Sequence, residues 1–158
     1  MKMFLEDKAK AVVLEFRGEY RFLSNFWPVP HGVRLPEDPN VYPSVEHGYV
    51  AAKMLTQSLR NLVLKIKHPG EAKRFGRLEE KPGFQEIKLS VMADLIRQKF
   101  APSTELADRL LATGDAKLIE GNNWNDTFWG VCRGEGRNEL GKMLMAQRRR
   151  LREGIANE

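Results

Sequence analysis

One segment of the sequence, which begins at Ser44, constrains the fold more than any other. Ser44 follows Pro43 at a position suited to a helix N-cap, and the acidic Glu46 stands in what would be the first helical turn. Apolar residues then recur at helical spacing as far as about Ile66. We therefore predict one long amphipathic helix from Ser44 to about Ile66.

The sequence contains further helical patterns and two short segments with strand character. Pro69 favours a helix start because its missing N–H is not needed in the first turn, and Gly76 favours a helix end. Ser103 can cap another helix after the stop at Pro102. The predicted helices cover residues 69–76, 84 to about 100, 103–111 and 138–153, and the predicted strands cover residues 11–16 and 116–121.

Two aromatic, polar and glycine-rich loops, residues 17–32 and 122–137, make up much of the rest. Several helices with little strand indicate a mostly helical α+β fold with a small β-sheet and long aromatic-rich loops. A chain of 158 residues suits one compact domain. We predict a single domain over residues 1–158, with its core at about 11–152, and function in the loops that this scaffold holds.

The sequence also bears on cellular location. Its N-terminus reaches Glu6 after a short apolar run, so it lacks the apolar core of a secretory signal, and no window is long enough to span a membrane. The only cysteine, Cys132, cannot form an internal disulfide. We expect a soluble, cytoplasmic protein without a membrane partner.

The net charge of +5 comes largely from the segment QRRRLR at residues 147–152. Such a segment complements the dipole of a helix end and solvates a surface, which is the ordinary interpretation and the one that we prefer. The other interpretation is a patch that binds nucleic acid.

Glu46 and Lys53 are candidates for catalysis. They stand seven positions apart, so two helical turns place them on nearly the same face, about 10 Å apart along the axis. A glutamate can transfer protons, and a lysine with a neutral amine can attack a carbonyl carbon or its equivalent. Spacing alone favours the ordinary alternative, a helix-start glutamate and a solvated lysine.

Metal chemistry is not expected. Glu46 and His47 are adjacent, and neighbours on a helix point about 100° apart, so they cannot easily hold one ion together. His31 and His68 lie in Pro/Gly contexts without ligand spacing. We predict no metal and assign His47 to support of the helix start.

The two loops share a mixture of side chains that suits a nucleoside phosphate. Tryptophan and phenylalanine faces can stack on a planar ring, amides can bind hydroxyl groups, and arginine can bind phosphate. Aromatic residues in loops also often just close over a core, so this signal leaves both interpretations open. The candidate substrate-binding residues are Arg17, Gly18, Ser24, Asn25, Phe26, Trp27, Asn123 and Trp129.

Together, these segments resemble the NADAR superfamily, the YbiA-like N-glycosidases. The matching stretches occur in family order and cover most of the chain from about Phe16 onward, which makes the set more specific than any one motif. They are FLSNFWP (22–28), YPSVEHGYVAAKM (42–54), EAKRFGR (71–77), ATGDAKLIEGN (112–122) and DTFWGVCRGEGRNELGKMLMAQR (126–148).

The resemblance implies a compact α+β enzyme that cleaves N-glycosidic bonds without a metal or another cofactor. Two substrate classes are associated with the family: ribosylamino-pyrimidine or ribosylamino-uracil 5′-phosphates of the riboflavin pathway, and ADP-ribose on guanine of nucleic acid. Carried over by position, Lys53 is the nucleophile, Glu46 an acid or base, and Asp126 a second carboxylate, while Trp129 forms a pocket wall.

Two mechanisms remain open at this stage. Either a neutral Lys53 forms a Schiff base with the sugar, or a charged Lys53 binds the substrate while Glu46 activates water. A non-catalytic module that binds ADP-ribose or nucleic acid is a further alternative, although such a module does not need this lysine–glutamate pair. The helix also has Val50 where relatives commonly have glutamine, and Cys132 and Arg133 where many have smaller or more polar residues. These departures bear on the base that is accepted.

Overall fold

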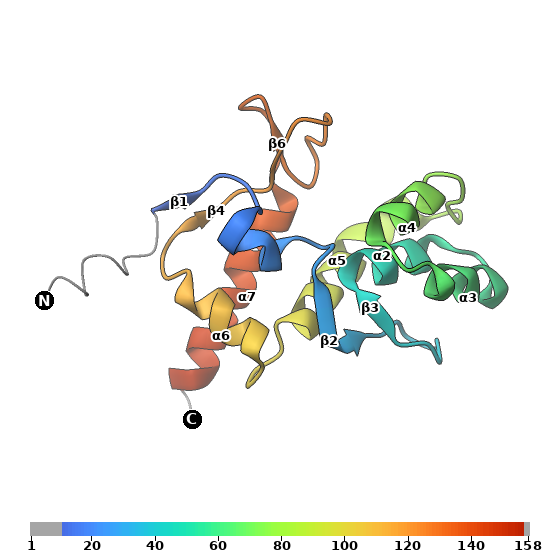
Figure 1. Ribbon diagram of the computed structural model, residues 1–158, viewed down its shortest axis with the longest axis horizontal. Coiled ribbons are helices and arrows are strands. Elements are labelled where there is room, and N and C mark those ends of the chain that lie inside the picture. Colours follow the sequence, from blue (N-terminus) through green and yellow to red (C-terminus); the bar gives the residue numbers. More distant parts are fainter. Residues whose placement is uncertain (1–10, 157–158) are drawn as a thin grey trace, which may run out of the picture. The chain divides into compact units, whose positions relative to one another are not determined.

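The computed structural model describes residues 11–156, with side chains as far as Gly154. The fold is α+β and mainly helical, as predicted. The chain forms two compact units, shown in Figure 1. The central unit comprises residues 25–99, and the terminal unit comprises the described residues up to Ser24 and from Phe100 onward. The predicted absence of a secretory signal concerns residues 1–10, which lie outside the described part.

The central unit is built around helix α2 (Val45–Lys53), whose residues from Val45 to Ala52 are all buried. Close approach of its neighbours explains this burial. A Cβ on Gly48 would lie 3.0 Å from Leu95, and one on Gly76 would lie 2.9 Å from Val50. Small residues at these two points let the helices pack tightly. The unit's other elements are β2 (Pro28–Val33), β3 (Tyr42–Ser44), α3 (Gln57–Lys65), α4 (Pro69–Gly76) and α5 (Phe84–Lys99).

The prediction of one helix from Ser44 to about Ile66 is wrong, because the chain leaves the helix at Met54. Met54 is extended, with ψ 136°. The backbone carbonyl of Lys53 accepts a hydrogen bond from the N–H of Lys81 (2.7 Å), and the Thr56 hydroxyl accepts one from the N–H of Leu59 (3.2 Å). Thr56 therefore caps a new helix, α3, and Lys53 becomes the last residue of α2.

Helices α4 and α5 agree with the prediction. Helix α4 begins at Pro69 and ends at Gly76, and α5 runs from Phe84 to Lys99. In the same unit, β2 and β3 pair antiparallel, with Pro28 opposite Ser44. This pairing leads the chain directly into the N-terminus of α2.

The terminal unit joins two small parallel sheets to two helices. Strand β1 (Val12–Val13) pairs with β4 (Lys117–Leu118), and β5 (Gly121–Asn122) pairs with β6 (Val131–Cys132). Figure 1 shows α6 and α7 side by side in this unit. Its helical elements are the 3₁₀ helix η1 (Gly18–Leu23), α6 (Glu105–Ala112) and α7 (Glu139–Ala156).

Both predicted strands are shorter than expected. After Val13, the backbone at Leu14 comes so close to Gly121 that a Cβ on Gly121 would overlap the Leu14 carbonyl. The paired strand ends at Val13, and the side chain of Leu14, the next residue of the apolar run, is 68% exposed. The predicted strand over 116–121 forms only the pair Lys117–Leu118 before the chain turns into β5.

The start of α6 also differs from the prediction. Ser103 lies in the left-handed region with φ 65°, and the cap is its neighbour Thr104, whose hydroxyl accepts a hydrogen bond from Ala107 N–H (3.1 Å). Either residue type can cap, and the tertiary path of the chain selects Thr104.

One arginine of the basic C-terminal segment is part of the packing of the terminal unit, whereas Arg149, Arg150 and Arg152 are exposed. Arg148 is buried; its two terminal nitrogens donate to the Thr113 hydroxyl (2.7 Å) and the Ala116 carbonyl (2.8 Å). Arg152 forms an ion pair with Asp115 at 3.0 Å. The preferred interpretation, a solvated segment at a helix end, is therefore wrong for the buried Arg148, while Arg152 stays exposed.

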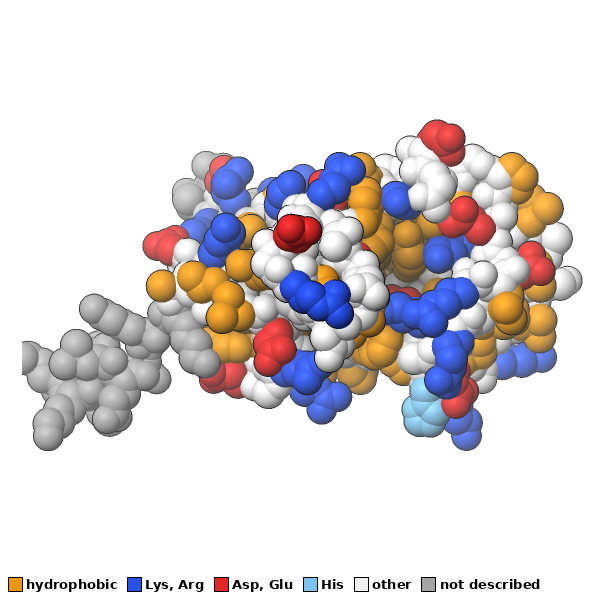
Figure 2. Space-filling view, turned by 90° about the horizontal axis from the view of Figure 1, so that it is seen from above, with side chains coloured by type: hydrophobic (Ala, Val, Ile, Leu, Met, Phe, Trp, Pro, Cys, Tyr) orange, Lys and Arg blue, Asp and Glu red, His pale blue; other side chains and the backbone are white. Residues whose placement is uncertain are grey.

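The distribution of surface charge and the character of the helices are relevant to binding of nucleic acid and of membranes. On the face shown in Figure 2, Lys and Arg side chains lie in several separate groups, between acidic, polar and hydrophobic ones. None of the helices formed by the described residues has the length and apolar character that a membrane span needs.

Candidate functional site

Helix α2 presents the two residues on which the catalytic hypothesis rests. Ser44 caps the helix, because its hydroxyl accepts a hydrogen bond from the N–H of His47 (3.1 Å). Glu46 lies in the first turn and is 8% exposed, and Lys53 ends the helix and is partly buried. The helix is continuous between them, so the predicted common face holds.

His47 supports this helix start. Its Nε2 donates to the Ile66 carbonyl (2.7 Å), so its Nδ1 accepts from the Ser44 hydroxyl (2.7 Å). Burial lowers the pKa of His47, while the hydrogen bond to Ile66 acts in the opposite direction. A neutral imidazole with both nitrogens engaged agrees with the predicted supporting role.

The amine of Lys53 lies against two aromatic rings. Its Nζ is 5.2 Å from the centre of the Tyr49 ring and 5.9 Å from that of Phe84. The two rings meet edge to face at 5.3 Å. Tyr49 precedes Lys53 by one helical turn, and Phe84 is the first residue of α5. This aromatic pair removes water from one side of the amine.

The surroundings of Lys53 lower its pKa on balance. Burial is the largest effect and lowers the pKa of Lys53 below the ordinary lysine value. The carboxylates of Glu46 and Glu80 raise this pKa, whereas the ammonium groups of Lys88 and Lys73 lower it further. A lysine with a lowered pKa holds more free amine at neutral pH, which is the form that attacks an electrophilic carbon.

The first aromatic loop reaches α2 through its backbone. The Asn25 carbonyl accepts a hydrogen bond from the N–H of Glu46 (3.1 Å), and the Asn25 amide donates to the Met92 sulfur at 3.6 Å. Phe26 is 41% exposed, and Lys73 Nζ lies 5.9 Å from its ring centre. The predicted residues Asn25, Phe26 and Trp27 thus belong to the same unit as Lys53 and Glu46.

The other predicted site residues belong to the terminal unit. Arg17 and Asn123 line a cavity of about 880 Å³ there. Gly18 opens η1 with φ 57°, a conformation that favours glycine, and the N–H of Ser24 donates to the Arg21 carbonyl (2.9 Å).

The second loop is organised by the side chain of Asn122. Its Nδ2 donates to the carbonyls of Asp126 (2.8 Å) and Val131 (3.2 Å), and its Oδ1 accepts from the N–H groups of Trp124 (3.2 Å) and Asp126 (3.1 Å). The side chain therefore satisfies the backbone of the loop and is not available to read a ligand.

Asp126 holds Trp129 in place. Its Oδ1 accepts hydrogen bonds from the N–H groups of Phe128 (3.1 Å) and Trp129 (2.9 Å). The carbonyls of the same two residues accept from the first N–H groups of α7, Glu139 (3.1 Å) and Leu140 (3.0 Å). Among the described residues no hydrogen bond engages Asp126 Oδ2, so this oxygen can accept a further hydrogen bond.

Reasoning from the sequence missed Tyr49 as a neighbour of the reactive amine and did not identify Phe84 at all. Tyr49 could have been found, because it lies four positions before Lys53 and such pairs meet on a helix. Phe84 had no local signal. Within residues 11–156, no group of three His, Cys, Asp or Glu side chains is arranged to hold a metal ion.

These features define an α+β protein in which one buried helix carries a carboxylate and a lysine whose pKa is lowered. Residues 13–152 match the family model for the NADAR domain, and the chain therefore belongs to this family. The match runs through both compact units.

Proteins of known name support this family membership. The chain is 36% identical over 139 residues to N-glycosidase YbiA of Escherichia coli K12, covering 84% of this chain and 82% of that protein. It is 38% identical over 136 residues to a riboflavin biosynthesis protein of Vibrio vulnificus, covering 84% of this chain, but it spans only 36% of that longer protein. The NMR structure of E. coli YbiA superposes with a TM-score of 0.77 at 31% identity and covers 94% of this chain and 90% of that one.

Proposed function

We propose that this protein is an N-glycosidase that hydrolyses the bond between a ribosyl phosphate and an amine nitrogen. The observation that carries the proposal is the half-buried amine of Lys53, which lies against the Tyr49 and Phe84 rings with its pKa lowered, on the same helix as Glu46. The name N-glycosidase YbiA of relatives that this chain matches over most of their length supports the same activity.

In the reaction that we propose, the ring of an N-ribosyl amine opens to an imine at C1 of the sugar. The neutral amine of Lys53 adds to C1, both of its protons pass to the departing amine, and a lysine–sugar imine remains. Water then adds to C1, releases the sugar as an aldehyde and restores the lysine amine. Glu46, with its carboxylate on the same helix face, transfers the protons in these steps.

A second route uses the same residues differently. Lys53 stays charged and binds the substrate, while Glu46 removes a proton from the water that attacks C1. The lowered pKa of Lys53 favours the first route, because a residue that serves only as a positive charge gains nothing from burial.

Within the proposed activity, a ribosylamino-pyrimidine or ribosylamino-uracil 5′-phosphate is the first substrate to consider. Riboflavin biosynthesis proteins of Vibrio vulnificus and maize contain a segment similar to this chain. The argument from the basic segment for the polymeric alternative, ADP-ribose on guanine of nucleic acid, is weaker than the sequence indicated, since Arg148 is buried within the fold. The proposed binding residues are Arg17, Gly18, Ser24, Asn25, Phe26, Trp27, Asn123 and Trp129, with Asp126 as a second carboxylate.

A product assay tests the proposal. The wild-type protein and the variants Lys53→Ala and Lys65→Ala are incubated with ribosylamino-pyrimidine phosphates and with ADP-ribosylated guanine oligonucleotides. Lys65 is an exposed lysine of α3 and serves as the matched control. We expect the wild type and Lys65→Ala to release the sugar phosphate and Lys53→Ala to bind without turnover. Full activity in Lys53→Ala would exclude the lysine mechanism, and binding without product in the wild type would favour the non-catalytic module.

A further inference from the structure

The cavity of the terminal unit has features that the proposed chemistry at Lys53 does not explain. It lies between residues 14–17, which follow β1, the strand β4, the loop around β5 and β6, and the first turns of α7. Five cationic side chains and one acidic side chain line it. We name it the cationic cavity; its cations are Arg17, Lys117, Arg133, Arg137 and Lys142.

The cations differ in how far they are already neutralised. Glu139, 15% exposed, pairs with Arg137 (3.0 Å) and Lys142 (3.7 Å). Arg17 meets Glu15 at 3.7 Å, but both side chains are more than half exposed, so this pair is weak.

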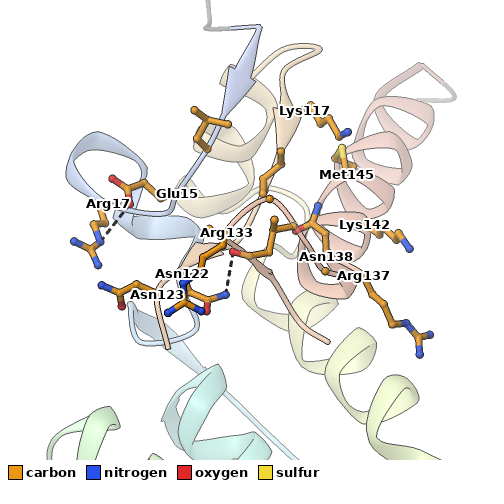
Figure 3. Close-up of a pocket in the computed structure, with 16 residues that line it drawn as sticks. Glu15, Arg17, Lys117, Asn122, Asn123, Arg133, Arg137, Asn138, Lys142 and Met145 are labelled. Atoms are coloured by element: carbon orange, nitrogen blue, oxygen red, sulfur yellow. Dashed lines mark hydrogen bonds and ion pairs between the residues drawn. The ribbon is translucent and has the colours of Figure 1, made fainter. Parts of the chain in front are cut away.

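The remaining two cations, Lys117 and Arg133, have no carboxylate partner among residues 11–156. Figure 3 shows Arg17, Asn123 and Arg133 gathered on one side, while the ends of Arg137 and Lys142 point the other way. An anion would therefore meet Arg133 and its neighbours first.

Arg133 occupies a backbone position that is unfavourable for it. Cys132 and Glu135 exchange backbone hydrogen bonds (2.8 and 3.1 Å), and the two residues between them have positive φ, 52° at Arg133 and 79° at Gly134. This is the arrangement of a type I′ turn, in which Asn, Asp or Gly is the usual residue at the position of Arg133. The turn would be more stable with another residue there.

The guanidinium of Arg133 is nevertheless held in a defined place. Its Nη1 donates to Asn125 Oδ1 (2.9 Å), and Asn125 itself has φ 67°. Arg133 and the residue that holds its guanidinium, Asn125, thus both have positive φ at the wall of the cavity. A binding function explains why arginine stands at a turn position that suits asparagine or glycine better.

The rest of the lining suits more than a bare anion. Asn123 is exposed, and its amide can bind hydroxyl or ring nitrogen atoms. The apolar wall offers contact to a flat ring, and the volume of about 880 Å³ is within the range for small-molecule sites. The apolar lining residues are Leu14, Ile119, Val131 and Met145.

We propose that the cationic cavity binds the phosphate group of a nucleotide, with Arg133 as the principal phosphate ligand and the apolar wall against the base. The cationic cavity shares Arg17 and Asn123 with the proposed substrate-binding residues and adds Arg133 and the apolar wall. The inference does not require Lys53 to be catalytic. The phosphate has two possible sources, a free nucleotide or the end of a nucleic-acid strand.

Amide NMR on isotope-labelled full-length protein tests this proposal. The ligands are adenosine 5′-monophosphate, adenosine, inorganic phosphate and a short 5′-phosphorylated single-stranded oligonucleotide. We expect the monophosphate to shift the amides of the β5–β6 loop and to bind more tightly than adenosine, since a charge-assisted contact to phosphate is lost in the nucleoside. Equal affinity for the monophosphate and the oligonucleotide indicates a free nucleotide, and tighter binding of the oligonucleotide with the same shifts indicates a strand end.

Two variants separate a binding role of Arg133 from a structural one. Arg133→Asn removes the cation but suits the left-handed turn, so the melting temperature should stay level or rise while affinity for the monophosphate falls about tenfold. Arg149→Ala removes an exposed arginine of α7 outside the cavity and should leave affinity unchanged. The same measurements on Lys65→Ala, which removes an exposed lysine of α3, should match the wild type.

Three results would overturn the proposal. One is equal affinity for adenosine and its monophosphate, because phosphate would then not be recognised. Another is an equal loss of affinity in Arg133→Asn and Arg149→Ala, which would indicate attraction by net charge only. The last is amide shifts confined to residues outside the cationic cavity.

Discussion

The Nζ atom of Lys53 lies 5.2 Å from the centre of the Tyr49 ring. The two residues are one turn apart on α2, so the helix itself sets this relationship, and Phe84 completes the apolar side of the amine from α5. An aromatic ring attracts an ammonium group, whereas loss of water disfavours it. The net effect is a lowered pKa of Lys53, because burial is the largest influence on it.

Removing an acidic or a basic neighbour of Lys53 should shift the pH–rate profile in opposite directions. If the free amine is the active form, activity rises with pH through the pKa of Lys53. Glu80→Gln removes a carboxylate that raises this pKa, so the rising limb of the pH–rate profile should move to lower pH. Lys88→Gln removes a cation that lowers it, so the limb should move to higher pH.

This prediction is checked by measuring the rates of both variants as a function of pH, at low and at high salt. Both shifts should shrink at high salt, more so for the exposed Glu80 than for the partly buried Lys88, since screening by salt is strongest for exposed charges. Lys65→Ala is the control and should leave the profile unchanged. Two shifts in the same direction would mean that the limb does not report Lys53.

Local signals predicted the helices well where the chain itself determines both ends. Pro69 and Gly76 bound α4 as expected, and the apolar spacing from Phe84 predicted α5. The break after Lys53 was missed because part of its cause is distant in sequence: the N–H of Lys81 donates a hydrogen bond to the Lys53 carbonyl. The local part, the N-cap Thr56, was visible but was outweighed by the continuing apolar pattern.

In the candidate site, too, the features set by local sequence were predictable and those set by distant contacts were not. A helical period is enough to place Glu46 and Lys53 on one face, and the family resemblance that gave them weight is confirmed by family membership. The environment of the lysine was not predictable, because Phe84 comes from another helix. The role of Asn122 was not predictable either, because an amide that satisfies loop carbonyls looks the same in sequence as one that binds a ligand. The catalytic and binding roles stay predictions.

Covalent trapping tests the Schiff base directly. Borohydride added during turnover should reduce a lysine–sugar imine and leave a sugar phosphate attached to Lys53, detected as a mass increase on the peptide that contains it. Lys53→Ala should show no adduct under the same conditions. If the active wild-type protein repeatedly shows none, water activation by Glu46 is the better mechanism.

Glu46→Gln tests proton transfer. The amide keeps the shape of the side chain but cannot exchange the proton, so the turnover number should fall by about 10²–10⁴-fold with little change in substrate binding. Circular dichroism verifies that the helix start, which Ser44 caps, is intact. Wild-type turnover in this variant would restrict Glu46 to its place at the helix N-terminus.

His47 predicts a pH dependence of stability. Its pKa in the folded protein is below the ordinary value of 6.5, so below that pH the unfolded chain binds more protons than the folded one. The free energy of unfolding should therefore fall as pH drops from about 7 to about 5. Denaturant titrations of wild type and His47→Gln measure this. The variant should show a weaker dependence over this range, and equal slopes would exclude His47 as the cause.

Asp126 allows a structural role and a chemical role to be separated by two substitutions. Asp126→Asn can keep an Oδ1 that accepts from the N–H groups of Phe128 and Trp129, so the loop should retain its stability, but the charge at Oδ2 is lost. Asp126→Ala removes both and should lower the free energy of unfolding by about 1 kcal/mol, as for loss of a capping side chain.

If Asp126 is the second carboxylate of the reaction, Asp126→Asn should melt like the wild type and yet lose activity as strongly as Asp126→Ala. Thermal melts and turnover rates on the same preparations measure both properties. Should Asp126→Asn retain activity while Asp126→Ala loses it, the residue acts only by holding Trp129. In that case Glu46 would be the carboxylate left from the predicted catalytic set, and it would have to serve both proton transfers, to the departing amine and from the attacking water.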